Sequence, residues 1–140
     1  GDLDSETPEL TSNSYSLPDD YPEMLSNLFS YHQSLSVLNG ESRLSLLKGE
    51  ASSKLAEHLE SNPGEIVALA YLDLATYAPT KNILNAIEER LVPGSILVAD
   101  EINFKNYQGA SRAFLEFLKG KNYEIIKSEY MTDRGYVVMK

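Results

Sequence analysis

Hydrophobic residues recur every three or four positions in four segments of the chain, which predicts four amphipathic helices. In the first of them Leu25, Leu28 and Phe29 fall on one face, and Pro22 lies in the first turn, where proline is favoured. A stop signal, Asn39-Gly40, follows this segment. The predicted helices cover residues 22–38, 51–60, 80–91 and 109–118.

Short apolar runs alternate with these helices and predict strands. Residues 66–74 and 95–99 are almost continuously apolar, the pattern of strands buried on both faces of a parallel sheet. Residues 43–48 predict a further strand, and residues 123–130 and 135–139 predict an antiparallel pair. The alternation predicts an α/β, Rossmann-like fold with a mostly parallel sheet, a C-terminal antiparallel strand pair and helices on both faces.

The chain has 140 residues, enough for one domain. Residues 1–40 hold seven acidic side chains and no Lys or Arg, and residues 1–20 are rich in Ser, Thr, Asp, Glu and Pro without any periodicity. Such a segment is too polar to bury itself. We therefore expect a flexible acidic arm over residues 1–20 and a single α/β domain over residues 21–140.

Charge and residue usage exclude several classes of function. The net charge of −9 has the wrong sign for a protein that gains affinity by neutralising phosphates, so neither nucleic acid nor an anionic membrane is an expected partner. The chain has no cysteine, which excludes thiolate zinc sites and a cysteine nucleophile. No apolar run approaches the roughly 20 residues that span a bilayer. We expect a soluble, cytoplasmic protein.

Acidic residues follow the predicted buried strands at the points where they end. Asp73 closes the first apolar run, Asp100 and Glu101 follow the second, and Glu50 follows the predicted strand 43–48. Ligands of open α/β sheets bind beyond the carboxyl ends of the strands, and clustered carboxylates suit a hard cation such as Mg²⁺. A second interpretation stays open, in which these acids only cap helices or solvate loops.

Two longer stretches resemble a known family. They are ALAYLDLATYAPTKNIL, residues 68–84, and ERLVPGSILVADEINF, residues 89–104. Both are similar to class I, S-adenosylmethionine-dependent methyltransferases, and within them to the macrocin O-methyltransferase-like sugar methyltransferases. The matching pieces are Leu72-Asp73, Tyr77, Pro79-Thr80, Leu91, Pro93-Gly94-Ser95 and Asp100-Glu101.

This resemblance implies a function and a set of site residues. Asp73, Asp100 and Glu101 correspond to the family's divalent-metal carboxylates. Glu50, Ala51 and Asp73 would border the S-adenosylmethionine pocket, the first two on its adenine side. The implied reaction is O-methylation of a small hydroxylated or sugar acceptor, in which a cation lowers the pKa of the reacting hydroxyl.

Two departures from the family pattern bear on catalysis. Ala75 stands where the family has its second acid, the expected general base, and an alanine cannot accept a proton; His32, Glu101 and Tyr77 are the substitutes that the sequence offers. The glycine-rich cofactor loop is also missing, because no two glycines are closer than nine residues.

By this resemblance the chain corresponds to the C-terminal portion of a methyltransferase. A non-catalytic methyltransferase-like module, or an inactive fragment that serves in association, is the alternative. The strands missing from such a portion would leave exposed sheet edges, which predicts a homodimer or larger oligomer.

Overall fold

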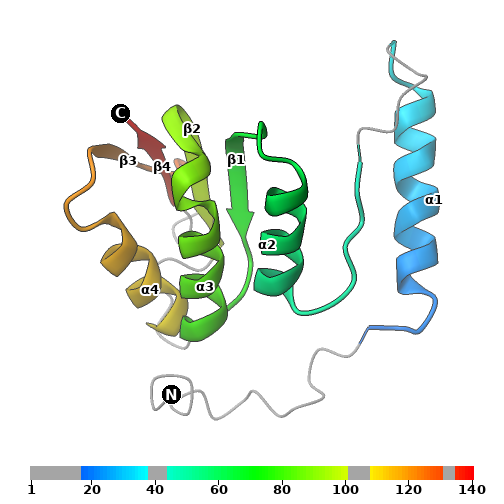
Figure 1. The fold of residues 1–140 in the computed structure, drawn as a ribbon, viewed down its shortest axis with the longest axis horizontal. Coiled ribbons are helices and arrows are strands. Elements are labelled where there is room, and N and C mark those ends of the chain that lie inside the picture. The colour runs from blue at the N-terminus through cyan, green and yellow to red at the C-terminus, as the bar shows by residue number, and fades with distance from the viewer. Residues whose placement is uncertain (1–16, 38–43, 101–107, 131–134) are drawn as a thin grey trace.

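The computed structural model describes residues 17–37, 44–100, 108–130 and 135–140, shown in Figure 1. Most elements lie where the hydrophobic pattern predicts them, with bounds that differ by a few residues. In chain order they are helices α1 (Tyr21–Ser34) and α2 (Ala51–Ser61), strand β1 (Val67–Leu72), helix α3 (Tyr77–Ile87), the 3₁₀ helix η1 (Glu88–Arg90), strand β2 (Leu91–Ala99), helix α4 (Gln108–Leu118), and strands β3 (Tyr123–Lys127) and β4 (Gly135–Met139).

The four strands form one sheet in the order β1-β2-β4-β3. Strands β1 and β2 are parallel, while β4 is antiparallel to both of its neighbours. The α/β class and the C-terminal antiparallel pair are therefore confirmed. The parallel share is smaller than predicted, because one of the three pairings between described strands is parallel.

The predicted strand at 43–48 is wrong over its described part. Residues 44–48 are extended but belong to no strand, because no described strand lies beside them to complete a hydrogen-bonded ladder. Three leucines of this connector between α1 and α2, Leu44, Leu46 and Leu47, are exposed. An apolar pattern alone therefore does not make a strand when the partner is absent.

Helices α2, α3 and α4 lie on one face of the sheet (Figure 1). Leu84 and Phe114 from the helices and Leu97 and Val137 from the strands are almost wholly buried between the two layers. No described helix packs on the opposite face, where Leu69 is 61% exposed. The prediction of helices on both faces is thus wrong for the described residues, because α2, α3 and α4 all pack on the same face of the sheet.

Helix α1 stands apart from the sheet and its three packed helices (Figure 1). None of its residues is buried, although it carries the apolar stripe that the sequence shows. It ends at Ser34, a few residues before the predicted Leu38, which lies outside the described residues. Among the described residues, no helix combines the length and the apolar character needed to cross a bilayer.

Candidate functional site

Two of the predicted site carboxylates follow neighbouring parallel strands. Asp73 comes directly after β1 and Asp100 directly after β2. The register pairs the last residues of these strands, Leu72 and Ala99, and the Asp100 backbone N–H donates to the Leu72 carbonyl oxygen at 3.0 Å. The two strand ends therefore lie side by side, at the edge of the sheet where α2 and α3 begin (Figure 1).

A small hollow lies between these strand ends and has room for about one water molecule. Asp73 is exposed and Asp100 is half-buried. The hydroxyl of Tyr71 donates a hydrogen bond to Oδ1 of Asp100 across the two strands. The residues that line the hollow are Leu72, Asp73, Leu74, Ala75, Thr80, Ala99, Asp100 and Ala110.

Sequence reasoning missed Tyr71 as a partner of Asp100. The signal that could have found it is the parallel register, which places Tyr71 beside Val98, two residues before Asp100. A register of this kind depends on which strands pair and at what offset. The register shifts between Val67 and Leu69, and nothing in the local sequence pattern indicates this shift.

Ala75 occupies a strained backbone position in the wall of the hollow. Its φ angle is +54°, and it is the one non-glycine residue with positive φ in the described part of the chain. The Thr76 N–H closes the turn by donating to the Leu74 carbonyl at 2.5 Å. Thr80, which is buried, then donates its hydroxyl to the Thr76 carbonyl at 2.6 Å. These hydrogen bonds hold the turn in place, and the methyl side chain of Ala75 cannot accept a proton.

Glu50 caps helix α2. Its carboxylate accepts the backbone N–H groups of Ser52 at 3.1 Å and Ser53 at 2.8 Å, together with both serine hydroxyls. These hydrogen bonds, with the Ser53 hydroxyl first, lower the pKa of Glu50 to about 2. Ala51 is the first residue of the helix. The structure thus gives Glu50 a capping role, and the cofactor contact of Glu50 and Ala51 stays a prediction.

The remaining predicted residues lie elsewhere. His32 is an exposed residue of α1, with its ring edge-on to Tyr31, and it does not line the hollow. Glu101 lies outside the described residues, so its predicted place beside the two aspartates is not described. Within the described ranges, no three His, Cys, Asp or Glu side chains gather closely enough to hold a metal ion.

Tyr77, the first residue of α3, belongs to a polar network between α3 and α4. Its hydroxyl donates to Oε2 of Glu116 at 2.6 Å and accepts from Nζ of Lys81 at 3.0 Å. Arg112 donates to the other oxygen of Glu116 at 2.9 Å. The hydrogen bond from Tyr77, followed by the one from Arg112, lowers the pKa of Glu116. Because its proton is engaged with Glu116, Tyr77 is a tie between the helices and a poor substitute base.

Comparison with solved structures supports the resemblance seen in the sequence. The structure of CalS11, a calicheamicin methyltransferase, matches 99% of this chain at 26% identity with a TM-score of 0.87. A second, apo structure describes CalS11 as a TDP-rhamnose 3'-O-methyltransferase; it matches 89% of this chain at 27% identity with a TM-score of 0.81. No family model and no curated protein matches the chain.

The match covers all but a small part of this chain and only part of the other. The chain spans about half the length of the CalS11 structures, 54% of one and 55% of the other. The shared part includes the parallel pair β1 and β2, the antiparallel pair β3 and β4, and the helices that pack on them. The chain therefore has a class I methyltransferase-like fold.

Proposed function

We propose that this chain is part of an S-adenosylmethionine-dependent O-methyltransferase that acts on a small hydroxylated or sugar acceptor. The observation that supports the proposal is the placement of Asp73 and Asp100. They follow neighbouring parallel strands and line one hollow, in a fold that overlays a sugar O-methyltransferase along 99% of the chain. Ligands of α/β sheets bind at this edge.

Asp73 and Asp100 suit a divalent cation such as Mg²⁺ because carboxylate oxygens are its preferred protein ligands. Asp73 is exposed, and Asp100 is held in place by Tyr71 and by its own backbone N–H. In the proposed role these two carboxylates orient the acceptor diol at the strand ends. A bound cation would stabilise negative charge on the acceptor oxygen.

The residues present fit only part of a pocket for S-adenosylmethionine, which supplies an electrophilic methyl group in such enzymes. The eight glycines are spaced too widely to form a glycine-rich loop. Glu50 is predicted to lie beside the adenine, but both of its carboxylate oxygens already accept hydrogen bonds from Ser52 and Ser53. The described residues therefore do not form a complete pocket for the cofactor.

A second function, that of a non-catalytic methyltransferase-like module, is favoured by one observation. Ala75 lies in the wall of the hollow, and by the family resemblance it stands where a general base is expected. Neither His32 nor Tyr77 replaces that acid in the structure, because His32 lies on α1 and Tyr77 donates to Glu116. Such a module would keep the fold and lose proton abstraction.

Calorimetric titration with S-adenosylhomocysteine, with and without Mg²⁺, separates the two functions. Because these residues form only part of the pocket, the transferase proposal expects weak binding that is strengthened by the cation and abolished by Asp73→Asn. Asp19→Asn, a change of the same kind at an exposed residue ahead of α1, is the matched control and leaves binding unchanged. Absence of heat at about a millimolar ligand, a binding energy weaker than about 4 kcal/mol, would favour the module.

A further inference from the structure

Residues of β1 fix both the backbone and the side chain of Asp100. The Asp100 N–H donates to the Leu72 carbonyl at 3.0 Å, and Oδ1 of Asp100 accepts a hydrogen bond from the Tyr71 hydroxyl. Both partners come from the neighbouring strand, because the parallel register continues to the strand ends, where Leu72 pairs with Ala99. The Asp100 carboxylate therefore has a defined orientation beside the hollow, although Asp100 is only half-buried.

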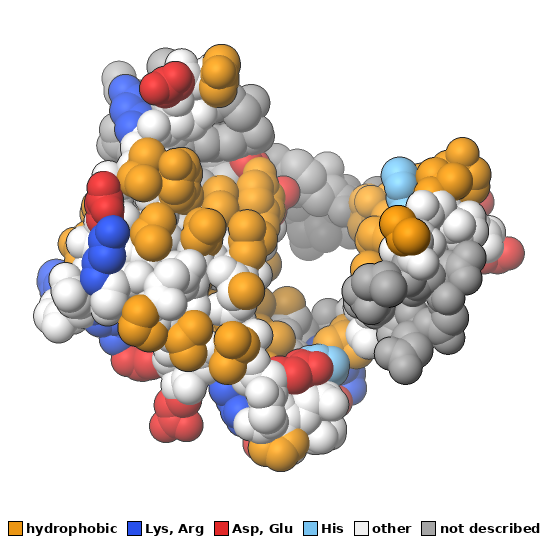
Figure 2. Space-filling view, turned by 90° about the horizontal axis from the view of Figure 1, so that it is seen from above, with side chains coloured by type: hydrophobic (Ala, Val, Ile, Leu, Met, Phe, Trp, Pro, Cys, Tyr) orange, Lys and Arg blue, Asp and Glu red, His pale blue; other side chains and the backbone are white. Residues whose placement is uncertain are grey.

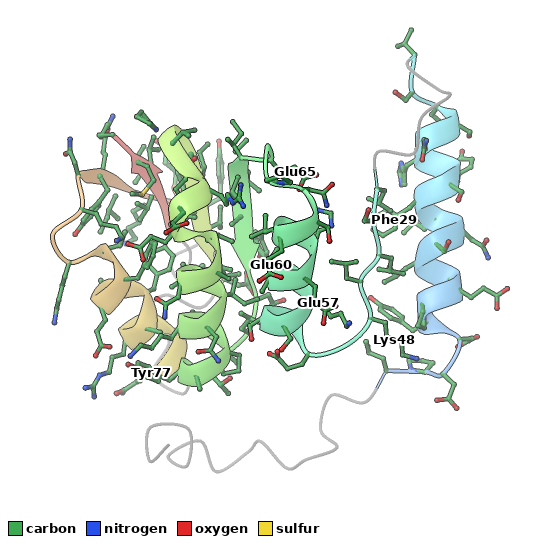
Figure 3. All side chains as sticks on the ribbon, in the orientation of Figure 1. Phe29, Lys48, Glu57, Glu60, Glu65 and Tyr77 are labelled. Atoms are coloured by element: carbon green, nitrogen blue, oxygen red, sulfur yellow. The ribbon has the colours of Figure 1, made fainter. Side chains whose placement is uncertain are left out.

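The donor that holds Oδ1 of Asp100 is an uncharged hydroxyl, so it orients this oxygen without cancelling its negative charge. Several glutamates elsewhere on the molecule lie beside basic side chains, which offset their charge, and Figure 2 shows acidic side chains (red) next to basic ones (blue and pale blue). The pairs are Lys54–Glu57, His58–Glu65, Lys121–Glu88, Arg112–Glu116 and Lys140–Glu124. Glu65 also lies at the end of the sheet opposite to Tyr77, which begins α3 at the edge shared by Asp73 and Asp100 (Figure 3). The two aspartates are thus better suited to a cation than these glutamates.

A carboxylate can bind a cation through one or both of its oxygens, and the cation decides which arrangement is favourable. Ca²⁺ accepts both oxygens of one carboxylate, because its coordination is flexible and includes more ligands. Mg²⁺ is smaller, requires an almost ideal octahedron and keeps several of its water molecules. The two oxygens of one carboxylate lie too close together to fill two corners of that octahedron. A carboxylate that offers one oxygen therefore favours Mg²⁺.

The hydrogen bond from Tyr71 opposes binding of a cation through both oxygens of Asp100. Turning both oxygens toward one ion would move Oδ1 away from the Tyr71 hydroxyl and break a hydrogen bond to a charged group, which is stronger than one between neutral groups. The hollow also has room for only about one water molecule, which favours the smaller ion. The orientation of Asp100 and the size of the hollow thus favour the same cation.

We propose that Tyr71 is a positioning residue that makes Asp100 a ligand through one oxygen, so that the site at the strand ends selects Mg²⁺ or Mn²⁺ over Ca²⁺. This inference rests on the cation role that the proposed function gives to Asp73 and Asp100. In it Tyr71 does not touch the ion and acts through the orientation of Asp100. Loss of such a partner of a metal ligand typically weakens metal binding by about 10- to 100-fold.

A purely structural role of Tyr71 is the competing interpretation. The hydrogen bond to Asp100 crosses from β1 to the end of β2 and would then only strengthen the contact between these strands. In that case Tyr71→Phe lowers the free energy of unfolding and leaves the preference among cations unchanged. The ratio of the affinities for Mg²⁺ and Ca²⁺ therefore separates the two roles.

The test measures binding of Mn²⁺ to the chain by electron paramagnetic resonance and then the displacement of Mn²⁺ by Mg²⁺ or by Ca²⁺. In the unaltered chain we expect Mg²⁺ to displace Mn²⁺ at a lower concentration than Ca²⁺ does. Tyr71→Phe should weaken the binding of Mn²⁺ and Mg²⁺ by about tenfold or more, with a similar fall in the ratio of Mg²⁺ to Ca²⁺ affinity. Circular dichroism checks that this variant is folded.

Two further variants serve as controls. Tyr136→Phe removes the same hydroxyl from β4, where Tyr136 pairs with Val98 on the side away from Tyr71, and it should leave the affinities unchanged. Asp100→Asn removes the proposed ligand and measures how much Mn²⁺ binds elsewhere on this acidic chain.

Two results would overturn the inference. One is an unchanged ratio of Mg²⁺ to Ca²⁺ affinity in folded Tyr71→Phe, which would leave Tyr71 a tie between strands. The other is the absence of Mn²⁺ binding beyond that of Asp100→Asn at about 10 mM, roughly ten times the dissociation constant of the weakest carboxylate sites. Because these measurements use no S-adenosylhomocysteine, selectivity that depends on Tyr71 in a chain that binds no S-adenosylhomocysteine would contradict the proposed function alone.

Discussion

Replacing Ala75 by glycine should stabilise the protein, although the change removes a side chain. Ala75 has φ +54°, in the left-handed region where a Cβ atom crowds the following carbonyl. For a non-glycine residue this conformation costs roughly 1–2 kcal/mol, and glycine adopts it freely. Part of this stabilisation is lost, because glycine increases the conformational entropy of the unfolded chain. We expect a net increase in the free energy of unfolding of about 1 kcal/mol.

Urea denaturation followed by circular dichroism measures this difference. With a slope of roughly 2 kcal/mol per molar urea, the midpoint should rise by about 0.5 M. The matched control is Ala56→Gly, the same change in the interior of α2, where glycine should lower the free energy of unfolding by about 1 kcal/mol. Both variants make the same chemical change, at residues with different backbone conformations. Changes of opposite sign in the free energy of unfolding would therefore be due to the backbone strain at Ala75.

A lower midpoint for Ala75→Gly would refute this reasoning. The methyl group of Ala75 would then contribute more by packing in the wall of the hollow than the turn costs. Equal losses in both variants would mean that the left-handed turn is not populated in solution. In that second case Leu74 and Thr76 would not be held as the structure describes.

Three further predictions concern stability and ionisation. Ser95→Ala should lower the free energy of unfolding by about 1–3 kcal/mol in urea denaturation, because the buried Ser95 hydroxyl donates to the Val67 carbonyl at 2.6 Å and the carbonyl would lose its partner. The pKa of Glu50 is lowered from 4.5 to about 2, so the stability from its cap is complete above pH 4.5 and is lost as the pH falls toward about 2; Glu50→Gln should flatten that part of a denaturation series in pH. Tyr77→Phe removes the hydrogen bond that most lowers the pKa of Glu116, so this pKa should rise toward its ordinary value in an NMR titration.

Local patterns predicted the elements of this fold, and the contacts between them were harder to predict. The nearly continuous apolar run at 66–74 contains β1, and the run at 95–99 forms the end of β2. Both strands could be predicted because residues that pack in a sheet are apolar in any sheet. Residues 44–48 have a similar apolar pattern and form no strand. Pairing depends on a neighbour from another part of the chain, which periodicity cannot supply.

In the candidate site, too, local features were predicted from the sequence, whereas a contact between strands was not. Asp73 and Asp100 were predicted to meet because acids at the ends of adjacent parallel strands share one edge, and both line the hollow. The engagement of Glu50 with Ser52 and Ser53 is local, and the capping alternative anticipated it. Nothing in the sequence indicated that Tyr71 donates a hydrogen bond to Asp100, because that contact depends on the register between two strands.

At Ala75 the backbone conformation suits an acidic residue, whereas the side chain is a methyl group that cannot act as a base. Left-handed conformations suit Asp and Asn better than Ala, so the turn keeps a shape that an acidic residue would occupy at lower cost. A strained conformation persists only where its surroundings determine it, and here the Thr76 bond to Leu74 and the Thr80 bond to Thr76 do so. By the family resemblance this turn would carry a proton acceptor beside Asp73, and in this chain it carries the methyl group of Ala75. Under the proposed function, the base that serves the acceptor hydroxyl must therefore be a residue other than Ala75.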